Sequence, residues 1–169
     1  LCACVKDEAR RFFWPLQVGV ASPLGCETAV HTVRQYMARH HDNSNKAVFC
    51  ADFSNAFNTV DRTTFLNACS ERFPRLAAWA RWCYESPSRL IFNDRVHEGL
   101  ESAAGVQQGD ALGPLLFSLA LHPLLIELKA IPGVDVVFGY LDDVVICGDD
   151  RAVDRAVALL SRKCVDIGL

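Results

Sequence analysis

Residues 134–147 constrain the fold of this chain more than any other segment, because two apolar runs are interrupted there only by acids. The runs at 134–141 and 144–147 are rich in β-branched and other apolar residues, which predicts two strands joined by a tight hairpin. Asp142 and Asp143 then lie at its tip, where an ordinary two-residue turn favours Asn-Gly or Asp-Gly. Adjacent carboxylates repel each other unless a cation neutralises them, so we expect a divalent metal here.

A further acid occupies a comparable position earlier in the chain. Residues 47–51 form a continuous apolar run that predicts a buried strand, and Asp52 follows at its C-terminal end. If this strand neighbours the hairpin in one sheet, Asp52 and Asp142 meet at one sheet edge. Carboxylates in that arrangement can hold two Mg²⁺ ions about 3.5–4 Å apart, as in in-line phosphoryl transfer. We therefore expect two Mg²⁺ ions as cofactor, with Mn²⁺ as a possible substitute.

Composition limits the class of protein. The 169 residues are 51% hydrophobic and 22% charged, which suits one domain with a sizeable core. The net charge of −3 counts against a simple nucleic-acid-binding module. Eight cysteines without a C-x-x-C pair favour reduced cysteines acting as small core residues inside a cell. With neither a membrane-spanning run nor a signal-peptide pattern, we expect an intracellular protein, nuclear or cytoplasmic, not secreted and without a membrane partner.

Helical periodicity, together with Pro and Gly punctuation, predicts the remaining elements. Helices are expected at residues 2–13, 27–40, 61–73, 76–85, from 114 onward, and 150–164. Asp61 should cap its helix, and Pro123 should kink or end the one that contains it. A second hairpin is expected around Asn93-Asp94. Strands and helices that mix without regular alternation favour an α+β fold, with helices packed on one face of a small antiparallel sheet.

Three blocks resemble motifs A, B and C of the reverse transcriptase palm, in the style of non-LTR retrotransposons. They are residues 51–58 (ADFSNAFN), 105–114 (GVQQGDALGP) and 140–143 (YLDD), in the family's order and spacing. Upstream, residues 17–20 (QVGV) and the helix after them resemble the end of the fingers. The resemblance implies a partial, helical fingers region at 1–44 and a palm at 45–169, truncated at its C-terminal side, with the thumb absent.

The resemblance also implies roles for the acids. Asp52 and Asp142 match the essential metal ligands, and Asp143 matches the auxiliary acid. The backbone carbonyl of Phe53 matches a further metal ligand.

Substrate contacts are implied in the same way. Phe57 occupies the steric-gate position, where a bulky ring under the sugar would clash with a ribose 2′-OH, which favours deoxynucleotides. Gln108 and Gly109 match the loop that touches the incoming nucleotide and the template, and glycine permits close backbone approach. Tyr140 resembles the residue that supports the primer end.

Together these features imply a fragment of an RNA-directed DNA polymerase that, in its intact retrotransposon parent, transfers a nucleotide from a dNTP to a primer 3′-OH. The partners would be an RNA template, a DNA primer, deoxynucleoside triphosphates and the remainder of the parent polyprotein, and the isolated fragment would be inactive. One alternative is an inactive palm-fold remnant that serves as a nucleic-acid-binding or structural module. Another is a nucleotidyl cyclase, although its usual Gly-Gly hairpin tip is absent. A second doublet, Asp149-Asp150, precedes a helical pattern and is interpreted as a helix N-cap.

Overall fold

The computed structural model describes residues 2–93 and 95–169. The helices are α1 (Cys2–Phe13), α2 (Gly25–His40), α3 (Ala56–Thr59), α4 (Arg62–Arg72), α5 (Pro74–Tyr84), α6 (Gly113–Lys129) and α7 (Asp150–Lys163), followed by a 3₁₀ turn, η1 (Val165–Ile167). The strands are β1 (Lys46–Asp52), β2 (Ser88–Phe92), β3 (Arg95–Ser102), β4 (Val134–Tyr140) and β5 (Asp143–Asp149). Asp94, expected in the turn between β2 and β3, lies outside the described residues.

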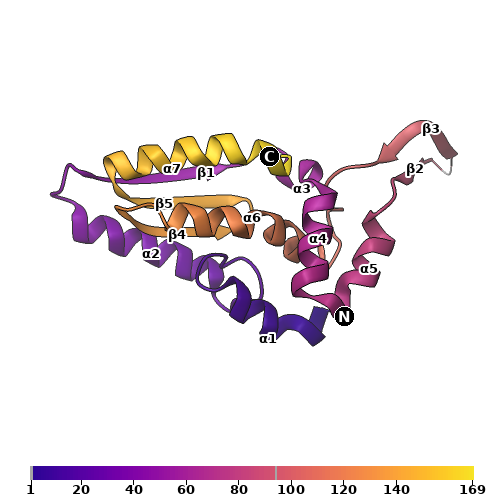
Figure 1. The fold of residues 1–169 in the computed structure, drawn as a ribbon, viewed down its shortest axis with the longest axis horizontal. Helices are drawn as coiled ribbons and strands as arrows, with labels where there is room; N and C mark the ends of the chain where they lie inside the picture. Colours follow the sequence, from indigo (N-terminus) through magenta and orange to yellow (C-terminus); the bar gives the residue numbers. More distant parts are fainter. Residues whose placement is uncertain (1, 94) are drawn as a thin grey trace.

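The central sheet has the order β1-β5-β4, and both of its pairings are antiparallel. The 134–147 segment forms the expected hairpin, but its turn is Leu141-Asp142 and Asp143 already begins β5, so the tip lies one residue earlier than predicted. β1 lies on the other side of β5, in the register that sets Asp52 opposite Asp143. The two acid-bearing segments are therefore neighbours in one sheet, and the α+β fold class is confirmed. β2 and β3 pair separately as a hairpin that projects away from the sheet (Figure 1).

Helices α6 and α7 pack against one face of this sheet, while α2 contacts β1 and β4 (Figure 1). Val137, Val144 and Ile146 point to the α6–α7 face and are buried in the core. On the opposite face of β1, Val48 and Cys50 are exposed. The prediction of a fully buried strand at 47–51 was therefore wrong, because only alternate residues of β1 pack in the core.

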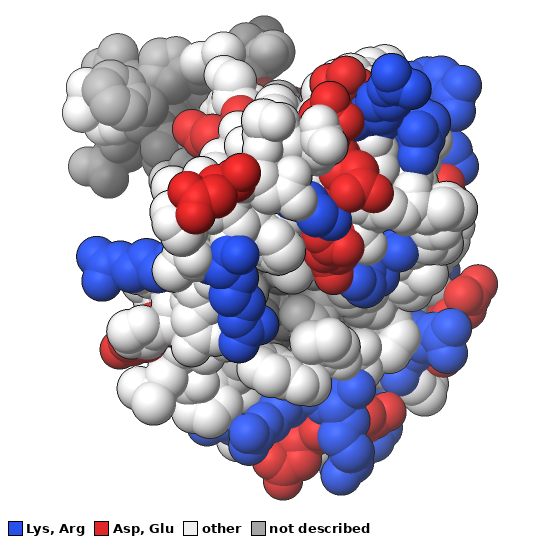
Figure 2. All heavy atoms as spheres, turned by 90° about the vertical axis from the view of Figure 1, so that its left-hand side faces the viewer, with Lys and Arg blue, Asp and Glu red and all other residues white. Residues whose placement is uncertain are grey.

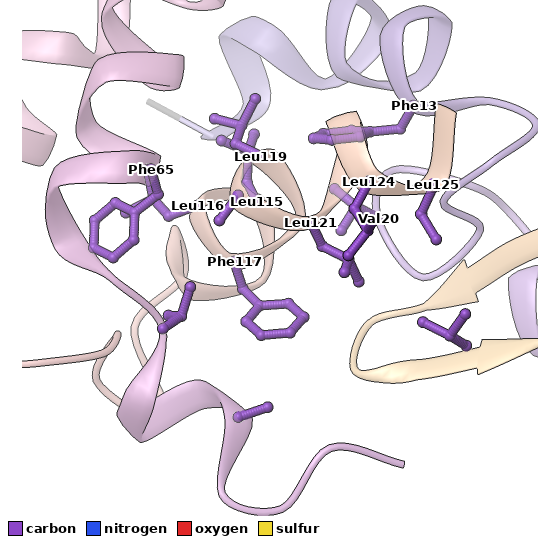
Figure 3. Packing of buried hydrophobic residues seen from close by; sticks show 14 of the residues in the cluster. Phe13, Val20, Phe65, Leu115, Leu116, Phe117, Leu119, Leu121, Leu124 and Leu125 are labelled. Carbon is purple, nitrogen blue, oxygen red and sulfur yellow. The ribbon is translucent and has the colours of Figure 1, made fainter. Parts of the chain in front are cut away.

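The core centres on α6, whose apolar residues pack in several directions (Figure 3). Phe13 from α1, Val20 from the following loop and Phe65 from α4 all belong to the same cluster as Leu116 and Leu125 of α6. One hydrophobic core thus includes residues from both the 1–44 and the 45–169 segments. Pro123 lies inside α6 without ending it, although an internal proline removes one backbone donor.

Local capping is largely as expected. The Asp61 carboxylate accepts a hydrogen bond from the Thr64 amide at 2.6 Å and so caps α4. Asp149 precedes α7, but its side chain makes no capping bond and pairs with Lys46 Nζ at 2.8 Å. Asp149 therefore occupies the N-cap position predicted for one residue of the Asp149-Asp150 doublet, but its side chain does not cap the helix. Short helix α3 was not predicted from the sequence.

The cysteines fit the prediction of small core residues only in part. Cys69 and Cys147 are buried, whereas Cys26 and Cys50 are exposed. Among the described residues, no helix is both long and apolar enough to cross a membrane.

Candidate active site

Three carboxylates gather where β1, β5 and the β4–β5 turn meet. Asp52 at the end of β1 lies directly opposite Asp143 at the start of β5, and Asp142 precedes it in the turn. Burial raises the pKa of Asp143, and the negative charges of Asp142 and Asp52 raise it further. The three acids therefore interact electrostatically across the sheet, and a bound cation would relieve their repulsion.

The donor chemistry of these residues fits Mg²⁺, which prefers hard oxygen ligands and needs only one or two protein carboxylates beside substrate phosphates. In residues 2–93 and 95–169, however, no group of three or more His, Cys, Asp or Glu side chains is arranged to hold a metal ion. Phe53, whose carbonyl is a further candidate ligand, directly follows Asp52, and its partly buried side chain packs against the core.

Phe57 lies in α3, and its ring stacks on that of Phe117 from α6, with centroids 4.7 Å apart and planes 12° apart. Its backbone carbonyl accepts a hydrogen bond from the Val106 amide at 2.6 Å. Gly105 adopts a φ of 68°, and a Cβ there would lie 2.3 Å from the Asn58 carbonyl carbon. The segments that carry Phe57 and Gly105 therefore lie side by side, and only glycine permits so close an approach.

Gln108 and Gly109 lie on an exposed turn between Val106 and the start of α6. The Asp110 amide donates to the Gln107 carbonyl at 3.1 Å, and the Gly113 amide donates to the Asp110 carbonyl at 3.0 Å. These bonds hold the turn compact with Gln108 and Gly109 accessible to a ligand. Gly109 has a φ of 93°, and a Cβ there would meet no atom within 4 Å.

A groove of about 570 Å³ separates α2 from the open face of the sheet. Asp52, Asp143 and Tyr140 line one part of it, and apolar residues of α2, including Ala29 and Val33, line another. The structure thus brings Asp52, Asp143 and Tyr140 to one groove. Phe57, Gln108 and Gly109 form a second set. The Val106 amide donates to the Phe57 carbonyl and so connects the segment of Phe57 to the loop that carries Gln108 and Gly109.

Two further polar residues contact this region, and no role in positioning it was predicted for either of them. The Gln17 side chain forms hydrogen bonds to the backbone of Leu141, in the β4–β5 turn. The Tyr84 hydroxyl accepts a hydrogen bond from the Gln107 amide at 3.2 Å. Their partners lie far away in the sequence, so no local pattern could have indicated these contacts.

Surface charge is mixed on the face shown in Figure 2. Lys and Arg side chains lie among Asp and Glu there and do not form one continuous basic stripe. Nucleic acid is therefore not expected to bind this face by charge alone.

Comparison with known proteins gives one family and a fold. The model of the family described as reverse transcriptase (RNA-dependent DNA polymerase) matches residues 3–169. The apo telomerase of Candida tropicalis, truncated from its C-terminal domain, superposes with a TM-score of 0.61 at 10% identity, over 99% of this chain and 37% of that one. Telomerase of Candida albicans, in complex with a TWJ fragment of telomeric RNA, gives 0.56 at 11% identity, over 98% and 32%.

The chain thus spans about a third of the length of these two solved chains. At such low identity the likeness shows the shared fold, a mixed α+β architecture that resembles a polymerase palm. No curated protein gives a significant match.

Proposed function

The chain belongs to the reverse transcriptase (RNA-dependent DNA polymerase) family, and from this premise we propose that it carries the catalytic palm of an enzyme that extends a DNA primer on an RNA template. The reaction is attack of the primer 3′-OH on a deoxynucleoside triphosphate, with release of pyrophosphate. One observation carries this proposal: Asp52 lies opposite Asp143 across β1 and β5, with Asp142 in the adjoining turn.

Each acid has a role in this proposal. Asp52 and Asp142 bind Mg²⁺, or Mn²⁺ in its place, and Asp143 assists them, with the Phe53 carbonyl as a further ligand. When bound, two such ions lower the pKa of the primer hydroxyl and stabilise the leaving pyrophosphate.

Phe57, Gln108, Gly109 and Tyr140 contact the substrates in this proposal. The Phe57 ring, fixed by its stacking on Phe117, excludes a ribose 2′-OH and so selects deoxynucleotides. Gln108 and Gly109, on their exposed turn, contact the incoming nucleotide and the template. Tyr140, which lines the groove with Asp52 and Asp143, supports the primer end.

The wider setting is part of the same proposal. Residues 1–44 form the end of the fingers and residues 45–169 the palm of a longer polypeptide, a non-LTR retrotransposon protein that acts inside the cell. The length of the two similar solved chains supports a longer parent, since this chain covers 37% and 32% of them. Residues 1–169 alone are then inactive, because binding of the template, primer and triphosphate also requires the complete fingers and the thumb.

A primer-extension assay on the parent polypeptide tests the catalytic assignment. Asp142→Ala should abolish extension of a DNA primer on an RNA template in the presence of Mg²⁺ and dNTPs. Asp150→Ala is the matched control, because Asp150 is an exposed acid at the start of α7 and should leave extension unchanged. Equal extension by the parent and its Asp142→Ala variant would reject the role of Asp142.

Two further results would change the proposal. Measurable extension by residues 1–169 alone would contradict the predicted inactivity of this segment. A parent that binds an RNA–DNA hybrid but extends no primer would favour the inactive palm remnant instead.

A further inference from the structure

Gln17 is a polar residue with a fully buried side chain, at 0% exposure. Its amide oxygen Oε1 accepts hydrogen bonds from the backbone N–H of Leu141 at 2.8 Å and of Gly19 at 3.1 Å. Its amide nitrogen Nε2 donates to the Leu141 carbonyl at 3.2 Å. A single side chain thus satisfies both backbone groups of Leu141, the residue before Asp142.

Backbone pairing brings Gln17 to this place. Gln17 forms a parallel bridge with Gly139, near the end of β4. The Gly139 amide donates to the Leu16 carbonyl at 2.7 Å, and the Val18 amide donates to the Gly139 carbonyl at 2.8 Å. Residues 16–18 therefore run beside the edge of β4, so that the Gln17 side chain reaches the turn beyond it.

Two glycines make this close packing possible. A Cβ on Gly139 would lie 2.9 Å from Gln17 Nε2, and a Cβ on Gly19 would lie 2.7 Å from the Leu141 backbone nitrogen. Both separations are shorter than ordinary carbon–nitrogen contacts, so any larger residue would force the loop away from the turn. Gly19 and Gly139 thus leave the space that Gln17 needs to reach Leu141.

Leu141 itself has an unusual backbone conformation. Its φ is 58°, in the left-handed region that leucine rarely adopts, because its Cβ crowds the backbone there. Such a conformation persists only where surrounding contacts hold it. The paired hydrogen bonds from Gln17 are contacts of this kind, and Tyr140 and Asp142 flank the residue that they hold.

We propose that Gln17 is a positioning residue, which fixes the left-handed turn at Leu141 and thereby the placement of Asp142 relative to Asp52. The inference rests on the proposed function for its consequence in catalysis, but the structural part stands on the Gln17–Leu141 contacts alone. Gln17 touches no reacting atom in this proposal and acts only through the turn.

The first test measures amide hydrogen exchange in residues 1–169. Gln17→Met keeps the length of the side chain but removes its three hydrogen bonds, two of which are to Leu141, so exchange at Leu141 and Asp142 should accelerate by about tenfold or more. The matched control is Tyr36→Phe, which removes a 2.9 Å hydrogen bond to Asp135 near the other end of β4. It should leave exchange at Leu141 and Asp142 unchanged. If Gln17→Met does not fold, Gln17→Glu replaces it, since that variant keeps the acceptor and loses the bond to the Leu141 carbonyl.

The second test measures primer extension by the parent. Gln17→Met should lower kcat by about tenfold or more, because displacement of a catalytic group by about 1 Å can cost up to a hundredfold. KM for the dNTP should change less than kcat, because Gln17 does not contact the nucleotide. Adding Leu141→Gly should restore part of the lost kcat, since glycine adopts a positive φ without support. A residue that merely fills the core would not be rescued in this way.

Two outcomes would overturn the inference: exchange at Leu141 and Asp142 that is no faster in the Gln17 variant than in Tyr36→Phe, or no recovery of kcat on adding Leu141→Gly. If the parent shows no extension at all, the proposed function fails separately, and the exchange result alone decides the role of Gln17.

Discussion

The Tyr84 hydroxyl, near the end of α5, donates a hydrogen bond to the Asp110 carboxylate in the loop that precedes α6. Burial raises the pKa of Tyr84, and the bond to Asp110 raises it further. The same hydroxyl accepts from the Gln107 amide at 3.2 Å, while Asp110 Oδ1 accepts from the Leu112 amide at 3.0 Å. One tyrosine therefore ties α5 to both ends of the turn that presents Gln108 and Gly109.

Removal of this hydroxyl should loosen the loop. We expect Tyr84→Phe to lower the free energy of unfolding by about 1–2 kcal/mol, because the Asp110 carboxylate and the Gln107 amide both lose a partner. Amide exchange across residues 107–112 should accelerate, as measured by mass spectrometry. Tyr36→Phe, which removes a comparable bond to Asp135, should cost similar stability without changing exchange in that loop. Equal exchange in the two variants would contradict the role of Tyr84.

Gly105 should tolerate no side chain. Its φ is 68°, and a Cβ would lie 2.4 Å from the Phe57 carbonyl oxygen. Gly105→Ala should therefore destabilise the fold by about 3 kcal/mol, through steric overlap as well as backbone strain. Gly109→Ala is the matched control, because Gly109 has a positive φ but open space around it, and it should cost about 1 kcal/mol. Urea unfolding of both variants gives the comparison, and equal losses would show that the contact with Phe57 is relieved at little cost.

Several elements of this fold could be predicted, because residues close together in the sequence determine them. The apolar runs on either side of the acid pair indicated the hairpin, and Asp61 as a capping residue indicated the start of α4, where its carboxylate does accept from the Thr64 amide. Whether β1 neighbours the hairpin was left as a condition by the sequence, and the structure meets that condition by setting Asp52 opposite Asp143. These features depend on periodicity and capping, which act over a few residues.

Other features depend on contacts between distant segments. Gln17 and Leu141 are 124 residues apart, and Tyr84 and Asp110 are 26 apart, so no short pattern reports either pair. The half-exposed state of β1 could not be predicted for another reason. Val48 and Cys50 are apolar although they face the open side of the sheet, so the alternation that marks a half-buried strand is missing.

The proposed role of Phe57 in selecting the sugar gives a further prediction. In the parent, Phe57→Val should admit ribonucleotides, because the smaller side chain leaves room for a 2′-OH, and should raise the incorporation ratio of rNTP to dNTP by about tenfold or more. Primer extension with each triphosphate alone measures this ratio. Phe49→Val is the control, since Phe49 lies in β1 and packs against the core, and it should leave the ratio unchanged. An unaltered ratio in Phe57→Val would remove Phe57 from sugar selection.

His122 should make the stability of the fold depend on pH. Its side chain is buried among aromatic rings, with centroids 4.7 Å from Phe12 and 5.3 Å from Phe13. Its Nδ1 has no hydrogen-bond partner among the described residues. Burial, and then the positive charge of Arg72, lower its pKa from 6.5 to about 4.

The unfolded chain therefore binds a proton at His122 more readily than the folded chain does. The contribution of His122 to stability is fully present above pH 6.5 and is lost progressively as the pH falls towards about 4. His122→Leu removes the titrating group and the unpaired nitrogen while keeping an apolar side chain in the core. The free energy of unfolding, followed by urea titration across this range, should then decline less steeply than in the unmodified chain. An equally steep decline in His122→Leu would assign the pH dependence to other groups.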